Sequence, residues 1–251
     1  MKKRGLLLVD RGSREKEAKT ELDYICKQVK DKGNYVYSNY CFLEVIPPYI
    51  EEGIKNALEY SIDSLTIVPY FLYPGKKVKA AVSAAMKLQS QTQVKFLVSK
   101  SMSMHQTMIE LVKNRANDVL KKEKITVDKK DVDVLIIGHG SKDLNAKRSI
   151  QYVADGIRPI FRNVEYCFLE IEEPTIHQGI ERCKEKNPKV LVIVFYFLHE
   201  GAHVKRDIYE DLNPALEKYQ FEKVLITKHI GTDEKMIELI LERAKEVEDA
   251  N

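Results

Sequence analysis

The sequence predicts an α/β protein built from two copies of one unit, each a four-stranded, mainly parallel sheet flanked by helices. The first observation is an internal repeat, because the segment YCFLE occurs at 40–44 and again at 166–170. The second is the alternation of short apolar runs with amphipathic stretches, which is typical of βαβ crossovers. The third is that the runs are almost continuously apolar, as expected for parallel strands covered on both faces.

The repeat extends over most of the chain and sets the expected domains. The two YCFLE segments are 126 residues apart (166 − 40). Four further residues recur at the same separation, namely Pro48, Ile50, Gly53 and Ile54 as Pro174, Ile176, Gly179 and Ile180. Near the start of each copy, RGS at 11–13 matches HGS at 139–141. We therefore expect an N-terminal domain at 1–124 and a C-terminal domain at 125–251, with the boundary in the polar segment KKEKITVDKKD.

The second copy displays the expected elements in order. Strands are predicted at the four apolar runs, 132–138, 164–170, 189–198 and 223–227. Helices are predicted at the amphipathic stretches that follow them, near 142–158, 174–186, 204–218 and 233–248. Pro214 should kink or restart the third helix, because proline cannot donate the helical hydrogen bond. In the first copy, the opening MKKRGLLLVD predicts a strand rather than a signal peptide, since its apolar run is short and lacks a cleavage site.

Composition and charge give no sign of several function classes. The 251 residues include 41 basic and 38 acidic side chains, a net charge of +3, which does not indicate a nucleic-acid binder. No apolar run approaches the roughly 18 residues of a membrane span. The four cysteines have no C-x-x-C spacing, and Cys41 and Cys167 lie in apolar strand patterns where burial is expected. We expect a reduced, cytoplasmic protein with neither nucleic-acid nor membrane partners.

Chemically active side chains follow the predicted strands of the second copy. His139 follows the first strand, Glu170 ends the second, His199 and His203 follow the third, and His229 follows the fourth. Ligands of open α/β sheets bind beyond the carboxyl ends of the strands. With strand order 2-1-3-4, the first and third strands are neighbours, so that His139 and His203 should face each other. We expect His199 and His229 to be auxiliary.

A histidine at a strand end can also be a packing or surface residue, and Ser141 can be a helix N-cap. Comparison of the copies favours a functional site. Five polar residues of the second copy are replaced in the first, namely His139, His199, His203, Asp207 and His229 by Arg11, Tyr73, Lys77, Ala81 and Ser101. The strand-end glutamate is kept as Glu44 and Glu170. Packing histidines have no reason to disappear together, whereas a single working site explains the pattern.

Three motifs together resemble the sirohydrochlorin chelatases. They are GHGS at 138–141, FLEIEEPTI at 168–176 and GAHVKRDI at 201–208, each at the end of a predicted strand. Members of this family are class II chelatases, lyases that insert cobalt or ferrous iron into sirohydrochlorin in cobalamin or siroheme biosynthesis. The resemblance covers nearly the whole chain as two tandem family units. It implies a cleft between two α/β lobes that holds the acidic tetrapyrrole.

The resemblance also implies roles for individual residues. His139 and His203 match the family's metal-site histidines, and Glu170 matches its glutamate, so that these three are the expected catalytic residues. Imidazole suits Co²⁺ and Fe²⁺. Metallation removes two pyrrole protons, which a histidine or Glu170 can accept. Asp207 either orients the imidazole of His203 or only favours the helix N-terminus.

The first copy lacks the histidines, which makes a symmetric two-site enzyme doubtful. Arg11, Lys76 and Lys77 place positive charge at the same edge. Either they bind substrate carboxylates or they form a solvated surface run. We assign these three residues and Ser141 to substrate binding.

The sequence also sets expectations for the cofactor, the metal and the oligomeric state. It has neither a Walker loop nor a G-x-G-x-x-G motif, so no nucleotide cofactor is expected. Cobalt is favoured over iron because neither a histidine-rich tail nor an appended domain is present. A monomer suffices to form the cleft, although a dimer is also compatible with it.

Two alternatives differ in class. A non-catalytic tetrapyrrole or metal carrier would use the same frame and would bind without turnover. A histidine-dependent hydrolase or phosphatase is less compatible, since Gly138 rather than arginine precedes His139, and no G-x-S-x-G motif occurs.

Overall fold

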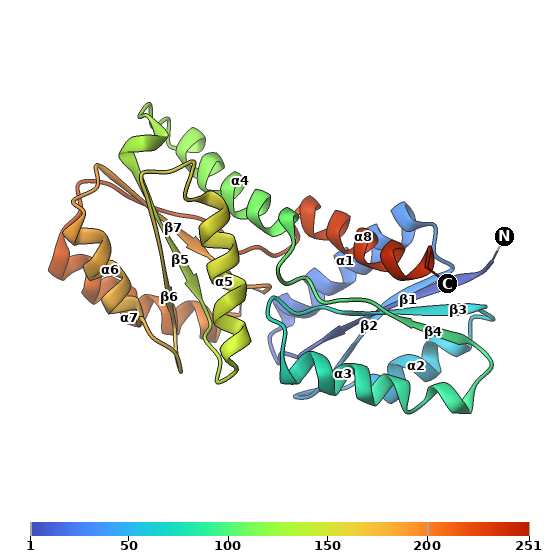
Figure 1. Cartoon of the computed structure of the whole chain (residues 1–251). Helices are drawn as coiled ribbons and strands as arrows, with labels where there is room; N and C mark the ends of the chain where they lie inside the picture. Colours follow the sequence, from blue (N-terminus) through green and yellow to red (C-terminus); the bar gives the residue numbers. More distant parts are fainter. Residues whose placement is uncertain (1, 200, 251) are drawn as a thin grey trace. The chain divides into compact units, whose positions relative to one another are not determined.

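The computed structural model describes residues 2–199 and 201–250, without the side chains of residues 144 and 202–204 (Figure 1). Its contacts divide the chain into two compact units. Unit 1 comprises Met1–Ser103 with Thr232–Asn251, and unit 2 comprises Met104–Gly231. Among the helices described, none combines the length and apolar character that a membrane span requires.

Unit 1 is built on one parallel sheet. Its strands are β1 (Arg4–Asp10), β2 (Tyr37–Phe42), β3 (Ser64–Pro69) and β4 (Lys95–Val98), in the order β2-β1-β3-β4. Its helices are α1 (Lys16–Gly33), α2 (Ile50–Leu58), α3 (Lys76–Met86) and α8 (Glu234–Glu248), with a short 3₁₀ turn, η1 (Gln89–Gln91). Asp10 pairs with Phe42 in register, which brings the carboxyl ends of β1 and β2 to one edge.

Unit 2 repeats this plan. Its strands are β5 (Val132–Gly138), β6 (Asn163–Phe168), β7 (Val190–Phe195) and β8 (Val224–Ile226), in the order β6-β5-β7-β8. Its helices are α4 (Gln106–Lys122), α5 (Leu144–Ile157), α6 (Ile176–Glu185) and α7 (Ala202–Tyr219), with a 3₁₀ turn, η2 (Lys129–Asp131). The predicted fold class of two four-stranded parallel sheets with helices is therefore confirmed, as is the strand order 2-1-3-4.

The last helix of each sequence copy belongs to the compact unit of the other copy. Helix α4 packs on α5, β7 and β8, and Arg115 donates a 2.9 Å hydrogen bond to the carbonyl of Ile230. Helix α8 packs on α1, β3 and β4, where the nearly buried Glu248 accepts hydrogen bonds from Tyr35 and Thr66. The compact units thus differ from the copies expected at 1–124 and 125–251. Amphipathic periodicity shows that a helix covers a sheet, but not which sheet it covers.

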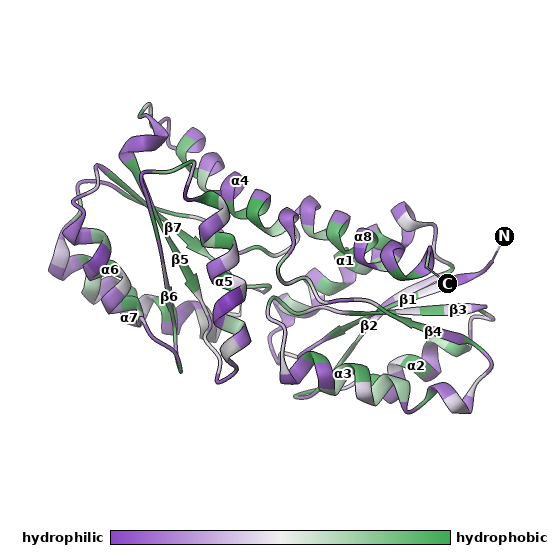
Figure 2. Cartoon of the chain, viewed as in Figure 1, coloured by the Kyte–Doolittle hydropathy of each residue, from purple (hydrophilic) through white to green (hydrophobic). Residues whose placement is uncertain are grey.

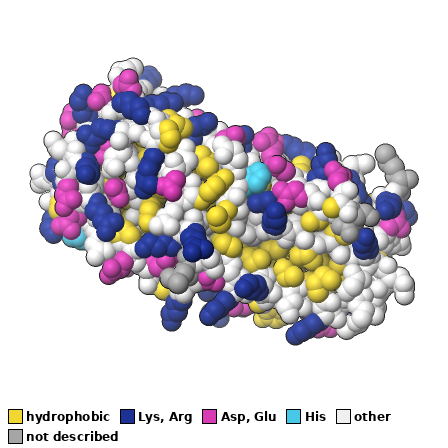
Figure 3. All heavy atoms as spheres, in the orientation of Figure 1, with side chains coloured by type: hydrophobic (Ala, Val, Ile, Leu, Met, Phe, Trp, Pro, Cys, Tyr) yellow, Lys and Arg dark blue, Asp and Glu magenta, His cyan; other side chains and the backbone are white. Residues whose placement is uncertain are grey.

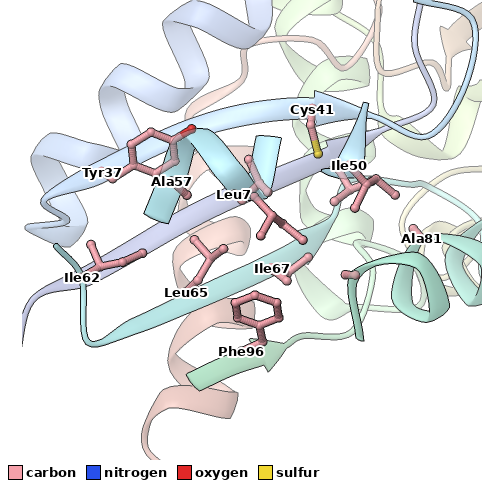
Figure 4. Packing of buried hydrophobic residues seen from close by; sticks show 13 residues of the cluster. Leu7, Tyr37, Cys41, Ile50, Ala57, Ile62, Leu65, Ile67, Ala81 and Phe96 are labelled. Atoms are coloured by element: carbon pink, nitrogen blue, oxygen red, sulfur yellow. The ribbon is translucent and has the colours of Figure 1, made fainter. Parts of the chain in front are cut away.

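Hydrophobic residues concentrate on the strands, whereas the helices alternate hydrophobic and hydrophilic residues (Figure 2). In unit 1, Leu7 of β1 lies beside Leu65 and Ile67 of β3, and each is at most 1% exposed (Figure 4). The four cysteines, all among the described residues, are buried, including Cys41 and Cys167, for which burial was expected. Each fully buried aliphatic side chain, such as Leu7 or Leu65, contributes about 1.5–3 kcal/mol to folding. The strands that form the hydrophobic core of each unit end at the sheet edge, where the candidate site of unit 2 lies.

Two details of the expected elements are narrowed or changed by the structure. Helix α7 continues through Pro214, so that of the two expected effects, a kink or a restart, the restart does not occur. The second and third strands of unit 2 end at Phe168 and Phe195, earlier than their apolar runs suggest. Glu170 and His199 therefore lie in the loops that follow β6 and β7.

Candidate functional site

His139 and Glu170 form a direct pair at the carboxyl edge of the unit 2 sheet. His139 directly follows β5, and Glu170 lies two residues after β6. The Nδ1 atom of His139 is 3.2 Å from Oε1 of Glu170, with side chains that are 31% and 54% exposed. The ring of Phe197, which follows β7, lies 6.3 Å from the His139 ring. Two of the three predicted catalytic residues are therefore in contact.

Backbone contacts lock the two loops together. The N–H of Glu170 donates to the carbonyl oxygen of His139 at 3.1 Å. The N–H of Leu169 donates to the carbonyl oxygen of Gly138 at 2.9 Å. Gly140 has φ of +91°, and a Cβ atom there would collide with the carbonyl oxygen of Glu170. Only glycine combines this backbone conformation with so close an approach. The sheet edge thus fixes the backbone that carries the His139–Glu170 pair.

Ser141 orders the loop before α5. Its N–H donates to the carboxylate of Glu172 at 3.2 Å, and its hydroxyl accepts from the N–H of Asp143 at 3.1 Å. Asp143, rather than Ser141, is the N-cap of α5, with its carboxylate accepting from Asn145. The cap position considered for Ser141 was therefore wrong by two residues, because either side chain suits that role. Its assignment to substrate binding stays a prediction.

A strained turn follows the glutamate in both units. The N–H of Glu172 donates to the carbonyl of Glu170 at 2.7 Å, which closes a three-residue γ-turn around Ile171 at φ of +71°. In unit 1, Val45 occupies the same turn at φ of +78°. Positive-φ γ-turns are rare and strained, and β-branched residues are outliers there. Ile171 is 57% exposed and Val45 is 41% exposed, so each unit presents an apolar side chain beside its glutamate.

A cavity of about 210 Å³ lies beside the His139–Glu170 pair, and we call it the acidic cavity. Leu169 and three acidic residues of α7, Asp207, Glu210 and Asp211, complete its lining. The predicted neighbour Asp207 is thus at this site. Sequence reasoning missed Glu210 and Asp211, although their spacing from Asp207 places them on one helix face. Arg206 lies 3.5 Å from both Asp207 and Glu210, which partly offsets their charge.

The second predicted metal ligand is only partly placed. His203 lies in the first turn of α7, four residues before Asp207, and its side chain is outside the described residues. Among the side chains described, no group of three or more histidine, cysteine or acidic residues is arranged to hold a metal ion. The pairing of His139 with His203 around a metal therefore stays a prediction.

His199 and His229 line a second, larger cavity of about 390 Å³, which we call the lysine cavity. The remaining residues of its lining are Phe195, Phe197, Gly201, Lys205, Ile208, Tyr209, Ile226, Thr227 and Lys228. The two auxiliary histidines thus lie apart from the acidic cavity, whereas their positions at strand ends had suggested one common group. Lys205 and Lys228 were not predicted, because isolated lysines on a charged surface give no distinctive sequence signal.

In unit 1, an ion-pair cluster occupies the matching positions. Arg11 Nε lies 2.9 Å from one carboxylate oxygen of Glu44, and Lys77 Nζ lies 2.5 Å from the other. Arg11, Lys77 and Glu44 correspond in sequence to His139, His203 and Glu170. Hydrogen bonds from Lys77 and then Arg11 lower the pKa of Glu44. The cluster carries a net charge of about +1, which is less than the two cations alone would give.

The third predicted cation of unit 1, Lys76, is the first residue of α3 and is exposed. On the face of the molecule shown in Figure 3, lysine and arginine side chains alternate with acidic ones. This mixed surface agrees with the net charge of +3.

Two parallel α/β units, of which one carries a histidine–glutamate pair at its strand ends, define a duplicated chelatase-like protein. The chain belongs to the CbiX family, whose model matches residues 5–119 and 133–247. This confirms the family resemblance of the sequence motifs.

Individual relatives agree over nearly the full length. The chain is 24% identical over 251 residues to the sirohydrochlorin cobaltochelatase of Priestia megaterium, covering 97% of this chain and 79% of that protein. It is also 24% identical over 246 residues to the sirohydrochlorin ferrochelatase of the same organism, covering 96% and 89%. The solved structure of SirB from Bacillus subtilis with Fe³⁺ superimposes with a TM-score of 0.82 at 22% identity, over 98% of this chain and 95% of that one. This likeness shows that the fold is shared.

Proposed function

We propose that this protein is a sirohydrochlorin chelatase that inserts a divalent metal ion into its tetrapyrrole substrate without ATP. The observation that carries the proposal is the 3.2 Å contact between His139 and Glu170 at the strand ends of unit 2. Unit 1 has an arginine at the matching position. Relatives named as sirohydrochlorin chelatases support the substrate assignment.

Glu170 can determine which ring nitrogen of His139 carries the proton. When the carboxylate accepts a hydrogen bond from Nδ1–H, the neutral imidazole keeps its lone pair on Nε2, which is the form that binds a metal. We propose that His139 and His203 hold the incoming ion through ring nitrogens. Two imidazole ligands leave coordination positions open for the pyrrole nitrogens of the substrate.

Metallation exchanges one divalent cation for two pyrrole N–H protons. The protons need acceptors near the macrocycle, and we propose that Glu170 and a histidine released by the metal accept them. Because Glu170 is half exposed, it can pass a proton on to water. Asp207, which lines the same cavity, would hold the imidazole of His203 in position.

Histidine substitutions test this division of roles. His139→Ala and His203→Ala should each lower the metallation rate by about a hundredfold or more, in the range of a lost general base or ligand. His177→Ala is the matched control, because that histidine lies on α6, its ring packs against that of Tyr219 at 5.6 Å, and it lines neither cavity. Absorbance of sirohydrochlorin follows turnover. Wild-type rates in His139→Ala, or a spectral change that stops at one equivalent of protein, would contradict the proposal.

The metal is proposed to be Co²⁺, with Fe²⁺ as the second choice. Imidazole ligands accept both ions, and affinity in this series follows the metal more than the site. Of the two Priestia megaterium relatives, one is named a cobaltochelatase and the other a ferrochelatase. Initial rates with Co²⁺, Fe²⁺ and Ni²⁺ under anaerobic conditions decide the preference, and a higher kcat/KM with Fe²⁺ would reverse our assignment.

Arg11, Lys76, Lys77 and Ser141 are proposed to bind substrate carboxylates. Since Arg11 and Lys77 already contact Glu44, a substrate carboxylate would share or replace that partner. Arg11→Ala should mainly raise KM and leave kcat nearly unchanged. A loss of kcat with unchanged substrate binding would contradict this role.

A further inference from the structure

The lysine cavity has the size and composition of a small-molecule site, and the proposed metal step does not use it. Its volume of about 390 Å³ falls within the range of about 300–1,000 Å³ that is typical of ligand pockets. It lies where β7 and β8 end, beside the first turns of α7.

The floor of the lysine cavity is formed by packed aromatic rings. Phe195 and Phe197 are each 7% exposed, and their rings meet edge to face at 6.5 Å. Tyr209 packs edge to face on Phe195 at 5.9 Å. Ile208 of the floor also belongs to the hydrophobic core of unit 2. This floor can receive methylene groups or a ring edge without rearrangement of the core.

The rim of the lysine cavity is cationic. Lys205 and Lys228 are exposed, His199 and His229 are half-buried, and no described residue of the lining is acidic. Helix α7 therefore separates charge, with Lys205 on this side and Asp207, Glu210 and Asp211 on the acidic cavity. An anion is favoured in one cavity and a metal cation in the other.

The two copies treat the lysines and the histidines differently. Lys205 and Lys228 match Lys79 and Lys100 in the first copy, whereas His199 and His229 match Tyr73 and Ser101. The lysines thus persist in the copy that lacks the candidate metal ligands. A role in binding an anion rather than a metal agrees with this pattern.

We propose that the lysine cavity binds one carboxylate side chain of the tetrapyrrole substrate, an inference that rests on the proposed function. Lys205 and Lys228 would pair with the carboxylate, and the phenylalanine floor would contact the attached methylene carbons. Phe197 lines this cavity and its ring lies 6.3 Å from that of His139. A substrate anchored here therefore keeps its macrocycle beside the proposed metal ligand.

Charge-neutral lysine variants test the cavity. Lys205→Gln and Lys228→Gln should each raise the KM for sirohydrochlorin by about tenfold, as expected for one lost charge-assisted hydrogen bond, and the double variant by more. Their kcat and their affinity for Co²⁺ alone should remain within about twofold of wild type. Lys189→Gln is the matched control, because Lys189 precedes β7 at the opposite end of the strand and pairs with Asp131. Its KM should not change.

A second measurement separates this inference from the proposed function. Fluorescence of metal-free sirohydrochlorin reports binding without turnover, and thermal unfolding of each variant checks that it folds. If the wild type metallates sirohydrochlorin but the double variant keeps the wild-type KM, the lysine cavity is not a substrate site, and the proposed function stands. If the wild type binds sirohydrochlorin without metallating it, weaker binding by the double variant still supports the cavity. If the wild type does not bind it, both proposals are wrong.

Discussion

The carbonyl oxygen of Glu170 lies directly against Gly140, in the space that a Cβ atom would fill. Unit 1 repeats the relationship, with Gly12 against the carbonyl of Glu44. Both glycines have positive φ, +91° and +106°. In each unit, the loop after the first strand is therefore pressed against the loop after the second, and this contact sets where the glutamate stands.

We expect Gly140→Ala to damage the site far more than Gly12→Ala does. Both substitutions force the loops apart and should lower the free energy of unfolding by a similar amount, about 1–3 kcal/mol for a residue at a strained φ. Only the first displaces Glu170 from His139. The kcat of metallation should fall at least tenfold in Gly140→Ala and little in Gly12→Ala, with urea denaturation as the check on stability. Equal rates in the two variants would show that the position of Glu170 does not matter for turnover.

The γ-turns at Val45 and Ile171 predict an unusual effect of glycine. A strained φ costs roughly 1–3 kcal/mol, whereas glycine costs only 0.5–1 kcal/mol through the unfolded chain. Val45→Gly should therefore stabilise unit 1 by about 1 kcal/mol, measured by urea denaturation. Val36→Gly, at a similarly exposed residue in the same unit, is the control and should destabilise. If Val45→Gly destabilises the protein by as much as Val36→Gly does, the γ-turn at Val45 holds no strain.

The fold could be predicted because its signals are local and repeated. Continuous apolar runs indicated the parallel strands, and the YCFLE segments aligned the two copies. The residues that follow the strands were expected to meet at one edge of the sheet, and His139 and Glu170 do lie there, 3.2 Å apart. A residue that follows a strand is positioned by the strand, so the shared edge could be predicted. The pairing expected from strand order, His139 with His203, stays a prediction.

Features that depend on contacts distant in sequence could not be predicted. Helices α4 and α8 have the amphipathic pattern of any covering helix, and nothing in it reveals that each packs in the other unit. Asp207 and Lys205 are two residues apart on α7, yet they line different cavities because of helical rotation. The contacts of Arg11 and Lys77 with Glu44 needed side-chain distances.

The Glu44 cluster predicts a specific dependence of stability on pH. Lys77 and Arg11 lower the pKa of Glu44 in the folded state. The stabilisation is therefore complete above the unfolded pKa of about 4.3 and is lost as pH falls through the lower folded value. Since Glu44 is 37% exposed, the effect should stay below about 1 kcal/mol. Wild type should exceed Lys77→Gln in unfolding free energy near pH 6, and the difference should shrink toward pH 3. A difference that is constant with pH would exclude Glu44 as its source.

Restoring the histidines should create a second metal site in unit 1. Arg11 and Lys77 stand at the sequence positions of His139 and His203, and both now neutralise the glutamate that matches Glu170. In the variant Arg11→His with Lys77→His, two imidazoles replace the fixed cations and Glu44 regains an unneutralised charge. Co²⁺ binding, measured by titration calorimetry without tetrapyrrole, should rise from one to about two ions per chain near pH 7, where imidazole ligands are neutral and can bind the metal.

The control for this gain places two histidines on the same elements at other positions, as Arg14→His with Lys79→His. It adds the same number of imidazoles but leaves Arg11 and Lys77 on Glu44, so its stoichiometry should remain that of the wild type. If both double variants bind the extra ion equally, surface imidazoles alone account for it. If neither does, unit 1 does not bring residue 11 and residue 77, which lies in the first turn of α3, to the spacing a shared metal needs. Because the same alignment assigns His203 to the metal in unit 2, that outcome would also weaken the proposed ligand pair there.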